Sequence, residues 1–159
     1  MIKVTLIALG KLKEKYLRDA CEEYRKRLSR YCSLNIIELN PVSLPDNPSN
    51  SQIESALKKE AEQIFSKIPE KSFKIALCVE GKGLSSEDFA QKLESLKTIG
   101  QEICLIIGSS YGLHSDVKQK SDFKLSLSNM TFPHQLFRVM LLEQIYRGFK
   151  INEGSTYHK

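Results

Sequence analysis

Three segments hold the residue types from which ligand-binding loops are built, and each follows an apolar run. They are Glu80 to Ser86, Gly108 to Leu113 and Leu127 to Gln135. Glycine directly after a strand lets a ligand approach the backbone closely. The first segment matches the dinucleotide pattern G-x-G-x-x-G only in part, because Ser86 stands in its third glycine position. A plain tight turn is therefore favoured there over a phosphate-binding loop.

The other two segments leave two interpretations open. Residues 108–113, Gly-Ser-Ser-Tyr-Gly-Leu, are typical of a ligand loop and equally of a flexible turn. Residues 127–135 bend after a strand and keep Met130 and Phe132, so their backbone N–H and C=O groups could bind an adenine edge. Packing of the same apolar side chains over the end of a sheet explains the spacing slightly better.

The chain ends in an aromatic ring, an imidazole and a cation in a row. Tyr157-His158-Lys159 could stack on a nucleic acid base and position it, or the tail could be disordered, as termini commonly are. His114, His134 and His158 have no metal-ligand spacing, which argues against a metal site. No Ser or Cys lies in a nucleophile elbow, so covalent catalysis has no support.

Alternating strands and helices must position these segments. Apolar runs predict strands at 2–9, 33–39, 73–79, 103–107 and 123–127. Apolar residues at three-to-four spacing predict helices between them and a long helix after Pro133. The pattern predicts an α/β fold around a mostly parallel sheet, in a single domain spanning residues 1–159. Ligands bind at the carboxyl ends of such strands, so a site is expected after Val79, Ile107 and Leu127.

Basic residues concentrate at the two ends of the chain. The 159 residues carry a net charge of +5. Residues 1–31 hold nine basic and four acidic side chains, residues 32–110 hold eight and eleven, and residues 111–159 hold seven and four. Basic faces suit a polyanionic partner, because neutralising phosphates releases counterions. A solvated Lys/Arg surface accounts for +5 equally well.

The composition excludes several classes of protein. Hydrophobic residues make up 41% and charged residues 27%, a globular balance. The longest apolar runs have five residues, far short of the about 20 that a membrane-spanning helix needs. The four cysteines form no C-x-x-C pair and no signal peptide is recognisable. We therefore expect a cytoplasmic protein with reduced thiols, no metal and no membrane contact.

Taken together, the segments resemble one family. The matching residues are Gly10 to Tyr16, Gly81-Lys82, Leu84 to Ser86, Gly108 to Leu113, Leu125 to Ser128, Met130 to Gln135, Arg138, Glu143 to Arg147, Phe149 to Ile151 and Tyr157 to Lys159. This set resembles the bacterial ribosomal RNA large-subunit methyltransferase H family, of the SPOUT superfamily, over essentially the whole chain. The Met-Thr-Phe-Pro-His-Gln block and the Tyr-His-Lys terminus are its most specific motifs. The chain departs from the family at Ser109, where a second glycine is common, and at Thr156, where Pro or Ala is common.

The resemblance implies a SPOUT-type α/β fold with a C-terminal trefoil knot, a topology that the general avoidance of knots argues against. It also implies a homodimer that uses S-adenosylmethionine to methylate N3 of a pseudouridine in 23S rRNA, within the assembled ribosome. Carried over by motif, the residues that would bind the methyl donor are Leu77, Gly108, Leu127, Ser128, Asn129, Met130, Thr131 and Phe132.

For this reaction we expect a direct in-line methyl transfer, in which N3 must lose a proton. His158 is the candidate base or hydrogen-bonding orienter, because imidazole titrates near neutral pH. Tyr157 could stack on the extruded base, while Arg138 and Lys159 could hold phosphates. The basic face of the first helix would supply salt-sensitive affinity for the ribosome through Arg25, Lys26, Arg27 and Arg30.

Two other functions stay open from the sequence. One is a dinucleotide-binding oxidoreductase built on Gly81 and Gly83, with Glu102 as the ribose acceptor. The missing third glycine counts against it. The other is a ribosome-associated protein without enzymatic activity that has lost donor binding, for which Ser109 is the only support.

Overall fold

A computed structural model describes all residues 1–159 and consists of a five-stranded sheet covered by helices on both faces. The strands run parallel in the order β2-β1-β4-β3-β5. The mostly parallel α/β architecture predicted from the sequence is confirmed. The elements in chain order are β1 (Ile2–Leu9), α1 (Lys15–Leu28), β2 (Cys32–Leu39), α2 (Asn50–Lys67), β3 (Phe73–Gly83), α3 (Ser86–Thr98), β4 (Ile103–Ile107), α4 (Ser115–Lys120), β5 (Phe123–Ser126), α5 (His134–Asn152) and a short 3₁₀ helix η1 (Thr156–His158).

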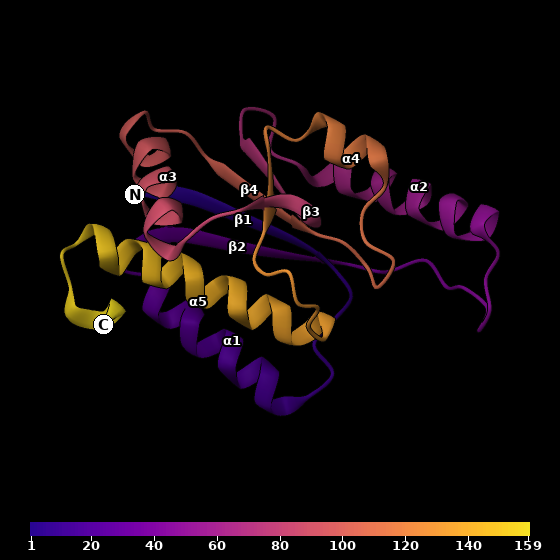
Figure 1. Cartoon of the computed structure of the whole chain (residues 1–159), viewed down its shortest axis with the longest axis horizontal. Helices are drawn as coiled ribbons and strands as arrows, with labels where there is room; N and C mark the ends of the chain where they lie inside the picture. The colour runs from indigo at the N-terminus through magenta and orange to yellow at the C-terminus, as the bar shows by residue number, and fades with distance from the viewer.

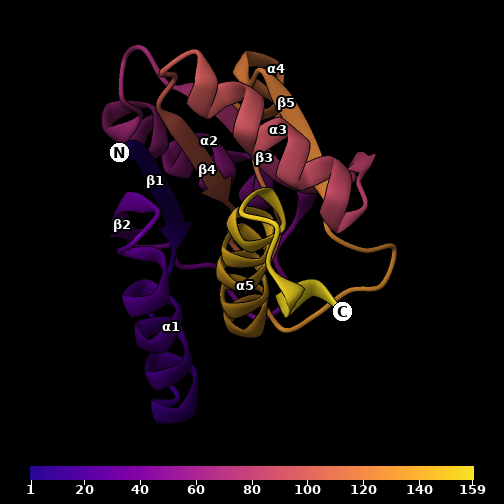
Figure 2. The same cartoon turned by 90° about the vertical axis from the view of Figure 1, so that its left-hand side faces the viewer.

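The helices divide between the two faces of the sheet. Figure 1 shows α2 and α4 on one side and α1 and α5 on the other, and Figure 2 shows α5 standing between α1 and α3. The larger core cluster packs α1, α3 and α5 on one face through residues such as Leu28, Leu93 and Leu141. The smaller cluster packs Ile64 of α2 and Val117 of α4 on the other. Because both faces of the sheet are covered, all five residues of β4 are buried, and the continuous apolar run follows from that burial.

The structure differs from the predicted elements in the glycine-rich segment after Val79. Glu80 to Gly83 were predicted to form a turn, but they continue β3, whose register against β5 shifts between Leu77 and Lys82. A Cβ on Gly81 would lie 2.6 Å from the backbone carbon of Leu125, so glycine allows the two strands to approach there. The strand-to-helix turn predicted over residues 80–86 is therefore wrong for residues 80–83, and the connection to α3 is only Leu84 and Ser85.

A second difference is α4, which the sequence did not predict. Its six residues contain a single buried apolar side chain, Val117, so no helical periodicity is visible. His114 precedes the helix as its N-cap. Its Nδ1 accepts a hydrogen bond from the backbone N–H of Asp116 at 3.1 Å, while its Nε2 lies 2.7 Å from Glu54 of α2. The imidazole thus caps α4 and ties it to α2, which fixes the end of the loop 108–113.

None of the helices is long and apolar enough to span a bilayer.

Candidate functional site

A cavity of about 480 Å³ opens at the carboxyl ends of β3, β4 and β5, at the edge where the sequence placed a ligand site. Its size falls in the range of small-molecule sites, about 300–1,000 Å³. Three stretches of chain form it: the end of β3, the loop after β4 and the segment between β5 and α5. Seven of the eight residues predicted to bind the donor line it, namely Leu77, Gly108, Leu127, Ser128, Met130, Thr131 and Phe132, whereas Asn129 does not.

The loop after β4 contains a tight turn. The N–H of Gly112 donates to the carbonyl of Ser109 at 2.8 Å, and Gly112 has φ +86°, a conformation that side chains disfavour. A Cβ on Gly108 would overlap the carbonyl of Gly112 and lie 2.9 Å from Cγ of Leu113. Only glycine at position 108 lets the loop close against the end of β4.

The segment after β5 is shaped by its own hydroxyl groups. Ser126 Oγ donates to the carbonyl of Ser128 at 3.1 Å, and Ser128 Oγ accepts from the N–H of Met130 at 2.9 Å. Met130 is 75% exposed and Phe132 37% exposed, so the rim of the cavity carries apolar side chains in contact with solvent. The interpretation of these two residues as core over the sheet end is thus wrong, since they border a cavity.

Charged groups in the wall of the cavity are paired. Lys118 Nζ forms an ion pair with Glu80, and this hydrogen bond is the main reason that the pKa of Glu80 is lowered. Burial lowers the pKa of His134, which keeps the imidazole neutral at pH 7, and its Nε2 lies 3.3 Å from the carbonyl oxygen of Leu9. Cys78 also lines the cavity and is half-buried, and burial raises the pKa of its thiol. No group of three or more potential metal ligands comes together in the structure.

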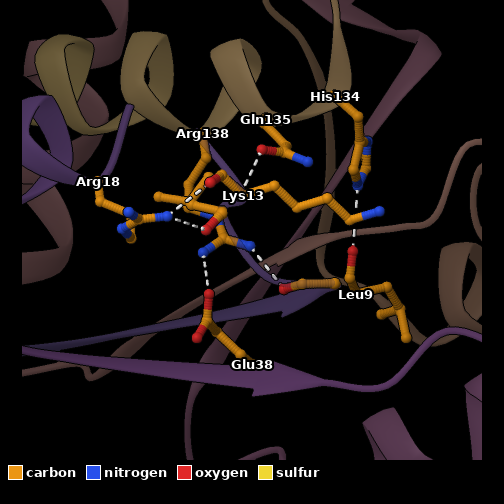
Figure 3. Close-up of polar contacts among 9 residues, drawn as sticks. Leu9, Lys13, Arg18, Glu38, His134, Gln135 and Arg138 are labelled. Carbon is orange, nitrogen blue, oxygen red and sulfur yellow. Dashed lines mark hydrogen bonds and ion pairs between the residues drawn. The ribbon is translucent and has the colours of Figure 1, made fainter. Parts of the chain in front are cut away.

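The start of α5 is fastened to the ends of β1 and β2 by a network of polar contacts (Figure 3). Arg138 is 4% exposed; its Nη1 forms an ion pair with Glu38 at 2.5 Å and its Nη2 donates to the carbonyl of Gly10 at 2.9 Å. The N–H of Lys13 donates to the side chain of Gln135 at 2.9 Å. Arg138, predicted to hold phosphates, does not line the cavity. It holds α5, and with it the segment 127–133, in place.

Replacing Arg138 by Met is expected to destabilise the protein by about 2–3 kcal/mol. The change leaves Glu38 and the Gly10 carbonyl without their partner. Loss of one member of a fully buried pair costs about 3–5 kcal/mol, and we discount that figure because Glu38 keeps 36% of its side chain exposed. Urea unfolding of R138M, E38Q and the double variant measures the coupling. Strictly additive effects would show that the pair contributes nothing.

The C-terminal residues lie on α5 and α3, away from the lining of the cavity. The Tyr157 ring packs edge-on against Tyr146 at 5.0 Å, and its hydroxyl donates to Oε1 of Glu143 at 3.3 Å. Burial is the main cause that raises the pKa of Tyr157 to about 12, so the phenol stays protonated. The tail is therefore ordered, as a 3₁₀ turn, rather than disordered.

His158 is held by charged side chains through both ring nitrogens. Its Nδ1 accepts from Nη1 of Arg147 at 3.2 Å, and its Nε2 lies 2.7 Å from Oε1 of Glu87 at the start of α3. Arg147 in turn forms an ion pair with Glu143 at 2.7 Å. The hydrogen bond to His158 is the main cause that lowers the pKa of Glu87. Since an arginine can only donate, the neutral ring carries its proton on Nε2 and offers Nδ1 as the acceptor.

Sequence reasoning did not single out Glu143 and Arg147 as site residues, although both contact the tail. Their spacing of four residues on a helix was a usable signal, because it places an acid and a base on the same face. Such pairs are common on solvated helices, which is why the spacing alone does not indicate a site. The structure brings the tail to this pair, and no residue of the tail lines the cavity.

Comparisons with known proteins identify the family of the chain. The family model described as "Predicted SPOUT methyltransferase" matches residues 2–158. The protein named Ribosomal RNA large subunit methyltransferase H of Clostridium beijerinckii is 52% identical over 159 residues, covering 99% of this chain and 100% of its own. The proteins of that name from Clostridium kluyveri and Clostridioides difficile are 50% and 46% identical over the same shares. The chain therefore belongs to the SPOUT methyltransferases and, among them, to the ribosomal RNA large subunit methyltransferase H family.

Proposed function

We propose that this protein transfers the methyl group of S-adenosylmethionine to N3 of a pseudouridine in 23S rRNA within the assembled ribosome. The observation that carries the proposal is the cavity at the carboxyl ends of β3, β4 and β5, lined by the family's motif residues. Relatives that are about half identical to this chain over their full length are named for methylation of large-subunit rRNA. With rRNA as the substrate we expect the protein to act in the cytoplasm, as one domain spanning residues 1–159.

The residues of the cavity fit an adenosine group. Leu77, Leu125 and Leu127 supply apolar walls, and residues 108–113 border the cavity with the tight turn that follows β4. Flat apolar walls and unhindered backbone groups are what an adenine ring needs for packing and hydrogen bonding. When bound, S-adenosylmethionine supplies a methyl group activated by the positive charge of its sulfonium. The protein then has to position the base, exclude water and remove a proton.

The tail offers groups for the base and for its proton. Tyr157 presents a ring that could stack on an extruded pseudouridine, and Nδ1 of His158 could accept the N3 proton once Arg147 moves away. In the alternative role Nδ1 only orients the base. Because the tail is tied to α5 and α3, we infer that transfer takes place in a homodimer in which one protomer's tail reaches its partner's cavity. Exposed Met130, Phe132 and Leu136 form an apolar patch beside the cavity that a second protomer could cover.

We also infer that the C-terminal part of the chain forms a trefoil knot. β5 lies at the edge of the sheet beside β3, yet α5 begins beside β1, where His134 contacts Leu9. Residues 127–133 must therefore cross the ends of β3 and β4. A trefoil knot requires such a crossing, because the chain has to thread past the loop that follows β3. Stretching single molecules by their two ends measures this: a knotted chain stays shorter than 159 extended residues, and full extension would contradict the inference.

Transfer of a labelled methyl group to ribosomes that lack the modification tests the proposed function. Mass spectrometry of the recovered nucleosides is expected to show N3-methylpseudouridine. Donor binding without transfer would mean that the RNA target is a different one. If the protein does not bind S-adenosylmethionine at all, the ribosome-associated protein without enzymatic activity is the remaining interpretation. Titration with NAD tests the oxidoreductase, which the turn-free path of Glu80–Gly83 through β3 already disfavours.

The basic residues of α1 are expected to contribute to affinity for the ribosome. Arg25 and Lys26 are exposed on this helix, Arg30 is exposed in the turn just after its last residue, and Arg27 is paired with Glu23 at 3.1 Å. Reversing the three unpaired charges to Glu should weaken ribosome binding several-fold at low salt. It should also flatten the salt dependence, since each phosphate contact contributes to its slope. Reversing Lys58, Lys59 and Lys67 of α2 is the control, and equal losses would show only a general charge effect.

A further inference from the structure

Glu60 of α2 is a buried carboxylate without a basic partner in the chain. It is 3% exposed, and the ion pairs of the structure involve other acids. Its Oε1 accepts from Ser109 Oγ at 2.8 Å and its Oε2 accepts from the N–H of Val42 at 2.9 Å. Both oxygens act as acceptors, an arrangement that suits the ionised carboxylate.

This carboxylate lies directly behind the donor loop. Ser109, its hydrogen-bond partner, lines the donor cavity, while Glu60 itself lines a second cavity of about 300 Å³ on the other side of residues 109–111. Residues 109–111 line both cavities and therefore lie between the buried charge and the space for the ligand. Glu60 also acts on His134 in the donor cavity, where it opposes the larger effect of burial on that pKa.

The other charges around the donor cavity are already balanced. Glu80 is paired with Lys118, Glu38 is paired with Arg138, and burial keeps His134 neutral. A buried charge is costly unless an opposite charge compensates it. The two hydrogen bonds satisfy the oxygens of Glu60 but leave its negative charge uncompensated. A cation in the adjacent cavity would complete the balance.

We propose that Glu60 is the counter-charge for a cationic ligand in the donor cavity and selects the sulfonium of S-adenosylmethionine over the uncharged thioether of S-adenosylhomocysteine. The proposal rests on the function proposed above and adds how the site distinguishes its donor from its product. Glu60 does not touch the reacting atoms, so it is a specificity-determining residue that acts across Ser109. Stronger retention of the charged donor would let the spent, neutral product leave.

The Glu60→Gln variant isolates the charge. A glutamine oxygen can accept from the N–H of Val42 while its amide group donates to Ser109 Oγ, so both contacts persist. Isothermal titration with S-adenosylmethionine and with S-adenosylhomocysteine then measures two affinities on one fold. We expect the affinity for the donor to fall about 5- to 20-fold, because the variant loses one charge–charge interaction across the partly buried loop between residue 60 and the cavity. The affinity for the product should change less than about twofold.

Glu62→Gln is the matched control, because Glu62 lies on the same helix but is exposed. Equal losses of donor and product affinity in E60Q, or no loss of either, would overturn the proposal and leave the proposed function intact. A wild-type protein that binds neither ligand would overturn both. Should E60Q not fold, Glu60→Asp keeps the charge and is expected to preserve the wild-type ratio of the two affinities. A ratio that falls in E60D as well contradicts the proposal.

Discussion

A protein that lacks Tyr157, His158 and Lys159 should transfer methyl groups about 10²- to 10⁴-fold more slowly than the full chain, the range that a general acid–base group contributes. Of the three histidines, only His158 lies in the tail, since His114 caps α4 and His134 begins α5. None of its residues lines the donor cavity. The affinity for S-adenosylmethionine, measured by calorimetry, should therefore stay within about twofold of the wild type, because the contacts that determine it are untouched.

Single substitutions divide the effect of the tail among its groups. His158→Gln removes the proton acceptor, whereas Tyr157→Phe keeps the ring and its packing on Tyr146 while removing the hydroxyl that contacts Glu143. We expect the first to account for most of the loss and the second for little of it. Full activity after deletion of the three residues would exclude the tail from the reaction and direct attention to Glu143.

Substituting Gly108 by Ala should weaken donor binding about 5- to 150-fold, corresponding to the about 1–3 kcal/mol that an extra methyl group costs in a closely packed place. The new Cβ would overlap the Gly112 carbonyl, so the tight turn 108–112 must open. Calorimetry with S-adenosylmethionine measures the loss, and thermal unfolding of the same variant shows whether the fold is kept.

Gly83→Ala is the matched control for Gly108→Ala. A Cβ on Gly83 meets nothing within 4 Å, and its φ is not in the left-handed region. It belongs to the glycine pair on which the dinucleotide interpretation depended. Donor affinity in this variant should match the wild type. An equal loss in both variants would contradict the assignment of the ligand loop to residues 108–112.

The two defective proteins can also be combined. If one protomer's tail serves its partner's cavity, mixing tail-deleted and Gly108→Ala protomers in equal amounts creates heterodimers with one intact site. Random association then restores about a quarter of the wild-type activity, since half of the dimers have one working site of two. No recovery after exchange of subunits would mean that each tail serves its own protomer.

The parts of the fold that burial dictates were readable from the sequence. A strand covered on both faces, such as Ile103–Ile107, leaves a continuous apolar run, and the ends of such strands indicated where the cavity lies. Residues 80–83 were wrongly predicted to form a turn. Position 81 requires glycine because the backbone of β5 packs against it, and not because the chain turns there. α4 has too few apolar residues to produce a pattern.

The parts of the site that lie within the family's motifs were predictable from the sequence. The specific block at residues 130–135 and the end of the chain pointed to the donor segment and the tail. Arg138 was a clear candidate for binding phosphate, but its partner Glu38 is 100 residues away in the chain, and only the folded structure shows the pairing. Glu60 was invisible for the same reason: one acid in an amphipathic helix gives no sign that Ser109 and Val42 will enclose it.

The unequal burial of the four cysteines provides a built-in chemical reporter. Burial raises the pKa of Cys32 and Cys104 to about 12, and Cys21 is buried as well, so these thiols should resist alkylation in the native protein. Cys78 is the exception, since it is only half-buried and faces the donor cavity. A small maleimide or iodoacetamide should therefore mark a single position, slowly, and any molecule that fills the cavity should shield it. The mass of the labelled protein would then report how much of the cavity is occupied by a ligand, without ribosomes and without catalytic turnover.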